Sequence, residues 1–451
     1  MIPSSRRTEA ARKAVHVLSG LFALLLRYLN GWQSLLLALA ALAFNALALP
    51  RMSGGALDRD ADRRRGYALG ILLYPLSVAI LIVIFHARLD IAAAAWALMA
   101  FGDGAATLAG TFIGGPRLPW NRSKSWAGFT AFVVAGASAA ALMQIWVAGG
   151  HPETPAPGFP VWTLALSVAI VGAFIESLPI GIDDNLTVPL LCAGLLFALW
   201  PVVPATLAGA EPPLRGQLLI AAVVNLIVAG AAYFARTVQP SGAIAGYLLG
   251  TAIYAFSGWP GYLILTLFFV LASGSTKVGY EMKAARRIAQ EAGGRRGARH
   301  AIANVGLAAL LAFLAAGTPH RTAMLIAFTA ALATAVFDTV STEIGQVYGK
   351  HPILITTLRP VPPGTDGAVS LEGTAAGLLA GAALAAAAWA TGMIPLPGAA
   401  VALAASFIGT TAESYIGATV ESMKMIDNEA VNFANTLVGA LSALAIWGLL
   451  K

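Results

Sequence analysis

The segment GDGAATLAGTFIGGPRLPWNRSKSWAG (residues 102–128) places an aspartate, several glycines and a cluster of basic residues within an otherwise apolar chain. Of the 451 residues, 58% are hydrophobic and only 11% are charged, and the mean hydropathy is +0.77. So little polar surface excludes a soluble protein. We therefore expect an all-α polytopic membrane protein without a nucleic-acid partner. The single cysteine, Cys192, excludes a disulfide framework.

Apolar stretches of about 17 to 25 residues predict roughly fifteen transmembrane spans, some of which, notably the short pair on either side of Gly258, could be half-spans. The basic N-terminal segment has no small-residue cleavage site after it, which favours a retained first helix. The expected spans are residues 14–30, 32–49, 66–86, 90–113, 125–148, 161–180, 186–208, 216–236, 242–258, 260–277, 301–316, 322–345, 371–391, 399–418 and 431–450.

The distribution of basic residues indicates how these helices are oriented. If the N-terminus lies in the cytoplasm and the sides alternate, most of the 28 Lys and Arg residues fall on the cytoplasmic side. The exceptions are Arg27, Arg88, Arg215, Arg321 and Lys451. In this orientation Asp103 lies inside the fourth span, and residues 117–124 form the cytoplasmic loop that follows. A carboxylate within a span is costly in lipid, so Asp103 is expected to face a cavity and a cationic partner.

The same layout returns 235 residues later. Asp103, Gly110 and Gly114 have the spacing D-x6-G-x3-G, which Asp338, Gly345 and Gly349 repeat. Each motif is followed by a loop containing lysine and then by S-x-x-G at the start of the next span. Further acidic and amide residues follow in both halves: Glu176, Asp183, Asp184 and Asn185 in the first, and Glu413, Glu421, Asp427 and Asn428 in the second. These correspondences predict an internal duplication, with two parallel repeats joined by an extra linker helix at residues 211–236.

Each half contains the residue types that a phosphoryl-transfer site needs. Carboxylates can hold Mg²⁺, while cations and the N–H groups of a helix N-terminus can hold phosphates. In the first half the expected metal ligands are Asp103, Glu176, Asp183 and Asp184, and the phosphate contacts are Arg122, Lys124 and the helix that begins at Ser125. In the second half the acids are Asp338, Glu343, Glu413, Glu421 and Asp427, the cations are Lys350 and Arg359, and the helix entry is PPGTDGAVSLEG (residues 362–373). The chain has no G-x4-GK-[ST] motif, which excludes a P-loop enzyme.

Structural interpretations compete with some of these assignments. Glycines in apolar helices usually permit close packing, which favours packing over phosphate contact for Gly110, Gly114, Gly345 and Gly349. The basic run from Lys277 to Arg299 is interpreted as facing anionic lipid headgroups or solvent.

At these motifs the chain resembles known families over nearly all its length. The first half, with RKAVH (residues 12–16), GDGAATLAGTFIG and KSWAG, resembles the phytol kinase and dolichol kinase group, whose wider superfamily includes phosphatidate cytidylyltransferases. The second half resembles the phytyl-phosphate kinase family through four longer motifs: TVQPSGAIAGYLLG, DTVSTEIGQVYGKHPILIT, PVPPGTDGAVSLEGT and DNEAVNFANTLVGA. The first half lacks the long cytosolic extensions of dolichol kinases, which favours a shorter alcohol such as phytol or geranylgeraniol.

The resemblance implies a bifunctional isoprenoid salvage kinase in a multi-pass membrane protein. Residues 1–210 would phosphorylate a prenyl alcohol and residues 237–451 the prenyl monophosphate, with CTP or another nucleoside triphosphate as donor, Mg²⁺ as cofactor and membrane lipids around both units. The active sites would lie on the cytoplasmic side. Catalytic residues would be Asp103, Lys124, Glu176, Asp184, Asp338, Glu343 and Asp427, and metal ligands Asp103, Glu176, Asp183, Asp184, Asp338, Glu421 and Asp427. Nucleotide would be bound by Arg12, Lys13, His16, Gly110, Gly114, Arg122, Ser125, Lys350, Arg359, Gly364, Thr365, Asp366 and Ser370.

Two other functions fit the same residues. Polar side chains in duplicated helical units could line a translocation path, as in a prenyl-phosphate transporter or flippase. A cytidylyltransferase that makes a CDP-lipid has the same need for metal and nucleotide. Because the acids and cations gather at the cytoplasmic ends of the expected spans, the sequence favours the kinase.

Overall fold

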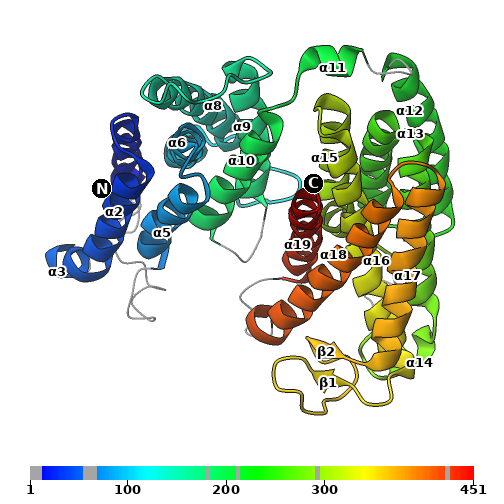
Figure 1. The fold of residues 1–451 in the computed structure, drawn as a ribbon. Helices are drawn as coiled ribbons and strands as arrows, with labels where there is room; N and C mark the ends of the chain where they lie inside the picture. The colour runs from blue at the N-terminus through cyan, green and yellow to red at the C-terminus, as the bar shows by residue number, and fades with distance from the viewer. Residues whose placement is uncertain (1–12, 54–68, 179–182, 210–213, 290–294, 422–426) are drawn as a thin grey trace. The chain divides into compact units, whose positions relative to one another are not determined.

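The computed structural model describes residues 13–53, 69–178, 183–209, 214–289, 295–421 and 427–451 (Figure 1). The chain divides into two compact units, residues 1–202 (unit 1) and residues 203–451 (unit 2). The described residues are mostly helical, as the apolar composition predicts. Arg12 lies outside the described residues, and so does the side chain of Glu421.

Unit 1 consists of helices whose ends are set by local sequence signals. Ser125 starts α8 because its side chain accepts a hydrogen bond from the backbone N–H of Gly128. The elements of unit 1 are η1 (Leu21–Arg27), α2 (Gly31–Ala43), η2 (Phe44–Ala48), α3 (Leu49–Ser53), α5 (Leu69–Ile84), α6 (Leu89–Ala97), η3 (Leu98–Asp103), α7 (Gly104–Phe112), α8 (Trp126–Ala148), α9 (Val161–Ser177) and α10 (Asp184–Leu199).

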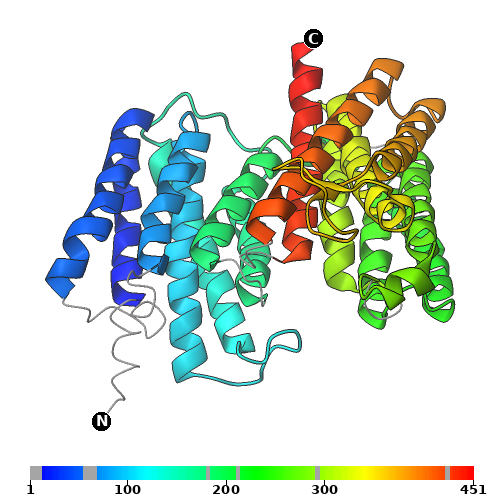
Figure 2. The same ribbon diagram turned by 90° about the horizontal axis from the view of Figure 1, so that it is seen from below.

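Unit 2 is also helical, with one short antiparallel hairpin in which Ile353 pairs with Val369. Helices α16 and α17 lie side by side, and α16 also packs against α13, α15, α18 and α19 (Figure 2). The elements of unit 2 are α11 (Pro204–Ala208), α12 (Leu214–Phe234), α13 (Pro240–Lys277), α14 (Tyr280–Ala285), α15 (Ala298–Gly317), α16 (Arg321–Tyr348), β1 (Ile353–Leu354), β2 (Ala368–Val369), α17 (Leu371–Ala390), α18 (Leu396–Ile416), η5 (Gly417–Glu421) and α19 (Asn428–Leu449).

Ten helices in the described part of the chain are long and apolar enough to cross a membrane, compared with the roughly fifteen expected. Residues 70–84, 161–177 and 184–199 form shorter apolar helices. The two expected spans at 242–258 and 260–277 form one element, α13, which has non-helical dihedral angles at Gly258 (φ 70°, ψ −169°). A straight helix of 38 residues would be about 57 Å long, far more than the ~30 Å apolar core of a bilayer. The break at Gly258 therefore divides α13 into two arms.

In each unit, the candidate span with the largest buried share carries one of the motif aspartates. In the apolar 18-residue stretch that defines each span, 78% of the residues are buried for the span 89–112, which includes Asp103, and 83% for the span 321–348, which includes Asp338. In unit 1, Asp103 ends a π-helical turn, η3, within this span. Such turns are frequent at functional sites because they redirect side chains from the regular helical pattern.

Close helix packing in unit 1 depends on two glycines around Phe132, which is fully buried. A Cβ atom added at Gly102 or at Gly172 would lie 3.2 Å from the Phe132 ring. These glycines therefore let η3 and α9 approach α8 closely, and this packing places Asp103 beside the end of α9.

Candidate active sites in the two units

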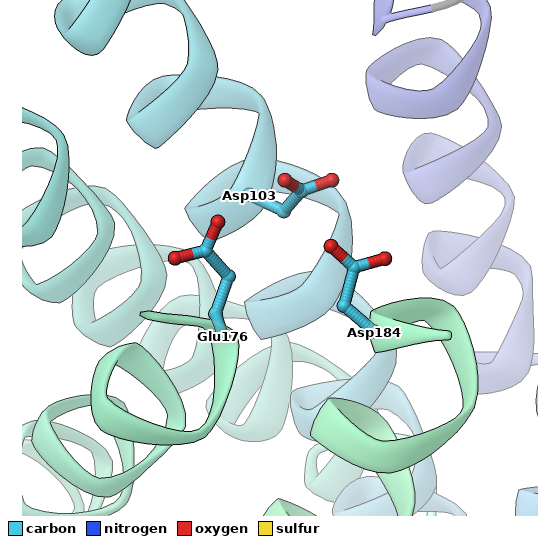
Figure 3. A group of neighbouring side chains, drawn as sticks. All are labelled: Asp103, Glu176 and Asp184. Atoms are coloured by element: carbon cyan, nitrogen blue, oxygen red, sulfur yellow. The ribbon is translucent and has the colours of Figure 1, made fainter. Parts of the chain in front are cut away.

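Three carboxylates of unit 1 converge on one point. Asp103 comes from the end of η3, Glu176 from the last turn of α9 and Asp184 from the first turn of α10, and their side chains point toward one another (Figure 3). One ligand oxygen from each lies within 4.8 Å of the others. Within the described residues this is the one group of three potential metal ligands. The sequence predicted these acids as partners.

Two lysines neutralise part of this charge. Lys13 forms an ion pair with Asp103, and Lys124 forms one with Glu176. His16 also lies close, with its Nε2 atom 3.5 Å from Asp103 Oδ2 and 3.4 Å from the carbonyl oxygen of Met99. Asp103 and Glu176 are both buried. Three carboxylates and two ammonium groups leave this cluster with a formal excess of negative charge, which suits a divalent cation.

The loop before α8 is tied to the end of α9, which explains the position of Lys124. Trp120 Nε1 donates to Ser177 Oγ at 3.0 Å, and Asn121 Nδ2 donates to the Ser177 carbonyl oxygen at 3.0 Å. Burial by itself lowers the pKa of Lys124, but the carboxylate of Glu176 and its hydrogen bond raise it, and the resulting pKa is above the ordinary lysine value. Lys124 is therefore protonated at neutral pH.

The other residues predicted for unit 1 are found at a helix cap, in a turn, at a close packing contact and on the surface. Asp183 is the N-cap of α10, where its carboxylate accepts a hydrogen bond from the backbone N–H of Asn185 at 3.0 Å. Gly114 has a positive φ of 67°, so it is a turn residue that favours glycine. A Cβ atom added at Gly110 would be 3.5 Å from Ser125 Oγ, which is consistent with close packing against the start of α8. Arg122 is exposed.

The donor set of the unit 1 cluster fits Mg²⁺. Carboxylate oxygens are hard ligands of the kind that Mg²⁺ prefers, and this ion commonly keeps several waters beside one or two protein carboxylates. Asp103, Glu176 and Asp184 could therefore hold it between them. Lys13 and Lys124 could then contact phosphate oxygens, because both lie at the edge of the same cluster.

Unit 2 contains a cavity of about 340 Å³ beside the C-terminal part of α16, and Asp338 of this helix lines it. We call it the polar cavity. Many of the residues predicted from the second half of the sequence line it: Asp338, Glu343, Gly345, Gly364, Thr365, Asp366, Ser370, Glu413 and Asn428. The loop that enters the cavity between β1 and β2 turns at Gly364 (φ 87°) and Gly367 (φ 73°), where a positive φ favours glycine.

Glu343 joins the polar cavity to a buried lysine. Its Oε2 atom forms an ion pair with Lys283, whose side chain is 1% exposed and which also donates to the Thr276 carbonyl oxygen at 3.0 Å. The other oxygen, Oε1, is buried and has no hydrogen-bond partner among the residues that the structure describes. Such an atom is suited to accept a hydrogen bond or to bind a cation from the cavity.

Asp427, Lys350 and Arg359, which the sequence also predicted for unit 2, do not line the polar cavity. Asp427 is the N-cap of α19, where it accepts a hydrogen bond from Ala430 N–H at 3.0 Å, and it forms an ion pair with Arg299. Lys350 and Arg359 are exposed and do not line the cavity. Ser370 caps α17 through Gly373 N–H at 3.2 Å, the same contact that Ser125 makes at α8.

The interpretation of the run from Lys277 to Arg299 as facing headgroups or solvent is wrong for two residues. Lys283 is fully buried, and Arg296 is partly buried and lines the polar cavity. Arg296 donates to Thr276 Oγ1 at 3.2 Å and contacts His300 Nε2. Nothing in the spacing of this run separates buried from exposed cations, because their partners come from α13, α15 and α16.

The helices and their buried acid and lysine clusters define a multi-pass membrane protein with polar sites at the ends of its buried helices. The chain belongs to the family described as integral membrane protein DUF92, whose model matches residues 223–440, within unit 2. A membrane protein of Synechocystis, named as uncharacterized, is 39% identical over 233 residues, which are 51% of this chain and 90% of that protein.

Two plant proteins are also similar. The chloroplast protein VTE6 of Arabidopsis thaliana is 38% identical over 226 residues, 49% of this chain and 68% of that protein. A chloroplast protein of Triticum aestivum named probable phytol kinase is 30% identical over 214 residues, 42% of this chain and 67% of that protein. No solved structure matches the chain.

Proposed function

We propose that this protein is a bifunctional prenyl kinase of the membrane. Unit 1 phosphorylates a prenyl alcohol to the monophosphate, and unit 2 phosphorylates the monophosphate to the diphosphate. A nucleoside triphosphate, CTP in our proposal, is the donor in both steps. The similarity to VTE6 and to plant proteins named phytol kinase supports a prenyl-related kinase in general. The observation that carries the proposal furthest is the cluster of Asp103, Glu176 and Asp184 with its two lysines.

In each step an oxygen of the acceptor attacks the γ-phosphorus of the donor. A new P–O bond forms, the bond to the oxygen that bridges the β- and γ-phosphorus atoms breaks, and the nucleoside diphosphate leaves with the bonding electrons. A hydroxyl acceptor releases its proton to a carboxylate oxygen of the site. Positioning and charge stabilisation supply most of the rate enhancement in such reactions, because negative charge spreads over the transferred phosphoryl group.

The residues of unit 1 are arranged for these tasks. Asp103, Glu176 and Asp184 would hold Mg²⁺, which would neutralise charge on the donor phosphates. Lys124 exchanges its contact with Glu176 for a donor phosphate oxygen, and its raised pKa keeps it cationic while it does so. Lys13 is held by Asp103 in the same cluster and supplies a second positive charge. The N-terminus of α8 directs backbone N–H groups toward the loop that carries Lys124.

In unit 2 the polar cavity takes the nucleotide phosphates. Glycines of the loop between β1 and β2 let the backbone approach them, and the start of α17 presents N–H groups beside Ser370. Asp338 and Glu343 are among the carboxylates that line the cavity. We propose that both sites face the cytoplasm, because the proposed donor nucleotide is cytosolic.

One assay distinguishes this proposal from its alternatives. Protein purified in detergent is incubated with Mg²⁺, CTP and radiolabelled geranylgeraniol, and the lipid products are separated. Prenyl mono- and diphosphates are expected. A CDP-linked lipid would instead indicate a cytidylyltransferase, and the absence of any product with CTP or ATP would favour a transporter.

A further inference from the structure

A second hollow in unit 2, of about 140 Å³, lies between α12, α13 and α15. We call it the apolar pocket. Its wall is formed mainly by hydrocarbon side chains, among them Val228, Ala229, Leu249, Phe268 and Phe269. Both arms of α13 contribute to it, because the chain reverses at the break near Gly258. A pocket of this composition binds an apolar ligand and offers little to a nucleotide.

The apolar pocket and the polar cavity share two residues, Arg296 and His300. Arg296 contacts His300 and donates to Thr276 Oγ1. A guanidinium carries five N–H donors, so these two contacts do not exhaust it. The guanidinium group of Arg296 therefore lies at the boundary between the apolar pocket and the polar cavity, which Asp338 and Glu343 line. This is the arrangement that an amphiphile with an anionic head and a hydrocarbon tail requires.

We propose that the apolar pocket holds the hydrocarbon chain of the prenyl monophosphate and that Arg296 binds its phosphate. The inference rests on the proposed function of unit 2 and extends it, because it assigns the acceptor site. The tail lies between α12, α13 and α15, while the phosphate sits at the junction and faces the donor phosphates in the polar cavity. A guanidinium group can donate two parallel hydrogen bonds to two oxygens of one phosphate, and this fixes the direction of the remaining acceptor oxygen.

Three glycines of α13 mark the depth of the pocket. A Cβ atom added at Gly242 would meet the backbone of Arg296, and one added at Gly250 would meet the side chain of Asn225. Gly246 lies between them in the helix and lines the pocket, and an added Cβ would have nothing within 4 Å. Successive members of this series are about 6 Å apart along the helix axis. A chain bound at Arg296 must therefore pass Gly246 unless it is very short.

The first test fills the pocket. Gly246→Phe should block long acceptors, and each excluded methylene should weaken binding about fourfold. We expect the KM for geranylgeranyl monophosphate to rise at least tenfold, while that for the five-carbon dimethylallyl monophosphate changes less than threefold. Retained turnover of the short acceptor also shows that the variant folds. Val228→Trp, from the opposite wall, provides a second obstruction if Gly246→Phe does not fold.

Gly230→Phe is the matched control for this substitution. Gly230 lies on α12 and does not line the pocket, and an added Cβ there also has nothing within 4 Å. This variant should keep the wild-type KM for both acceptors. Equal effects of Gly246→Phe and Gly230→Phe, or equal effects on long and short acceptors, would overturn the inference.

The second test concerns the phosphate. Arg296→Gln should raise the KM for both prenyl monophosphates by about tenfold or more, since a charge-assisted contact contributes whatever the chain length. Arg295→Gln, which removes the neighbouring exposed cation, should leave both values unchanged. Phosphorylation of the prenyl alcohol by unit 1 is a further internal control. A selective loss in the alcohol reaction would contradict the assignment.

A binding measurement separates this inference from the proposed reaction. Geranylgeranyl monophosphate with a diazirine at the end of its chain is photo-crosslinked to the protein without nucleotide, and the labelled peptides are identified. Labels on α12, α13 or α15 that Gly246→Phe removes support the acceptor site even if no phosphoryl transfer occurs, which would refute only the proposed function. Transfer by the wild-type protein with labels on other helices would overturn the acceptor site alone.

Discussion

Lysine and carboxylate pairs are the recurring device at the level of single residues. Lys13 pairs with Asp103 and Lys124 with Glu176 in unit 1, while Lys283 pairs with Glu343 in unit 2. A buried carboxylate is costly unless a cation accompanies it. A lysine is a suitable companion in a site that is proposed to accept a metal and phosphates, because its flexible stem can move the ammonium group to a new partner.

Lys124 provides a direct test of this exchange. If it contacts donor phosphates, Lys124→Ala should raise the KM for the nucleotide by roughly 10- to 100-fold, which corresponds to the ~1.5–3 kcal/mol of a hydrogen bond to a charged group. The KM for the prenyl alcohol should change little. Steady-state kinetics with each substrate varied in turn measures both effects, and Lys124→Arg should retain part of the nucleotide binding. An unaltered nucleotide KM and kcat would return Lys124 to a topological role.

The pH dependence of that effect follows from the pKa of Lys124. Glu176 holds this pKa above the ordinary lysine value despite burial. Lys124 therefore stays in its ammonium form at all pH values well below the ordinary pKa of a lysine. The ratio of nucleotide KM between Lys124→Ala and wild type should therefore be constant from pH 6 to pH 9. A ratio that falls toward one as the pH rises within this window would show that Lys124 loses its proton and that the pKa is lowered instead.

The buried pair of Lys283 and Glu343 predicts an effect on stability. Their side chains are 1% and 3% exposed, so Lys283→Met leaves a buried carboxylate without its cation. Breaking such a pair costs about 3–5 kcal/mol, which should lower the thermal unfolding midpoint in detergent by several degrees. Lys277→Met removes an exposed lysine and should have little effect. Equal midpoints for the two variants would show that the pair contributes nothing.

Residue types and spacing indicated which acids of unit 1 belong together but not what holds them. The sequence predicted Asp103, Glu176 and Asp184 as partners because they recur near the expected helix ends, and the structure brings their oxygens within 4.8 Å. The burial of Lys283 and the position of Arg296 could not be predicted. Both depend on contacts with residues 7 to 60 positions away in the sequence. The sequence of a basic run does not differ between a solvated and a buried segment.

At the level of elements, both S-x-x-G motifs form the same local structure. Ser125 caps α8 and Ser370 caps α17, each by accepting a hydrogen bond from the glycine N–H three residues later at 3.2 Å. The acid and amide motifs correspond as well, since Asp183 and Asp427 are the N-caps of α10 and α19. These matches are local. The parallel-repeat layout of the whole chain stays a prediction.

The caps permit a test of what these serines do. Ser125→Ala should lower the free energy of unfolding by about 1 kcal/mol, because an N-cap hydroxyl satisfies a backbone N–H that otherwise has no helical partner. Ser125→Asp should retain most of the stability, since aspartate is an equally good cap. Thermal unfolding midpoints of the purified variants in the same detergent make the comparison. If alanine and aspartate behave alike, the hydroxyl has another role.

Element boundaries were predictable where a local signal sets them, and less so elsewhere. Hydrophobic periodicity and capping residues locate the long helices, whose ends depend on nearby residues. The hairpin of β1 and β2 has only two residues in each strand and was not predicted, because so short a pair has no alternation to detect. The path of α13 around Gly258 depends on its packing against α12 and α15.

The whole molecule consists of two units with one candidate site each. In unit 1 the site is a close carboxylate cluster, and in unit 2 it is a larger cavity with a buried ion pair at its wall. The family match falls within unit 2. Each site lies on the most buried candidate span of its unit. Sites that belong to separate compact units should be separable by mutation, because substitutions without shared partners act independently.

Two isosteric substitutions test this separation. Asp103→Asn keeps the shape of the side chain but removes the charge that would hold the cation, so phosphorylation of the prenyl alcohol should fall about a hundredfold or more. Phosphorylation of added prenyl monophosphate should stay near the wild-type rate. Asp338→Asn should have the reverse effect, and prenyl monophosphate should then accumulate from the alcohol. The two reactions are measured separately on purified protein with labelled acceptors, and unfolding midpoints show that both variants fold. Loss of both reactions from either single substitution in folded protein would mean that the units share one site, and the assignment of one phosphorylation to each unit would be wrong.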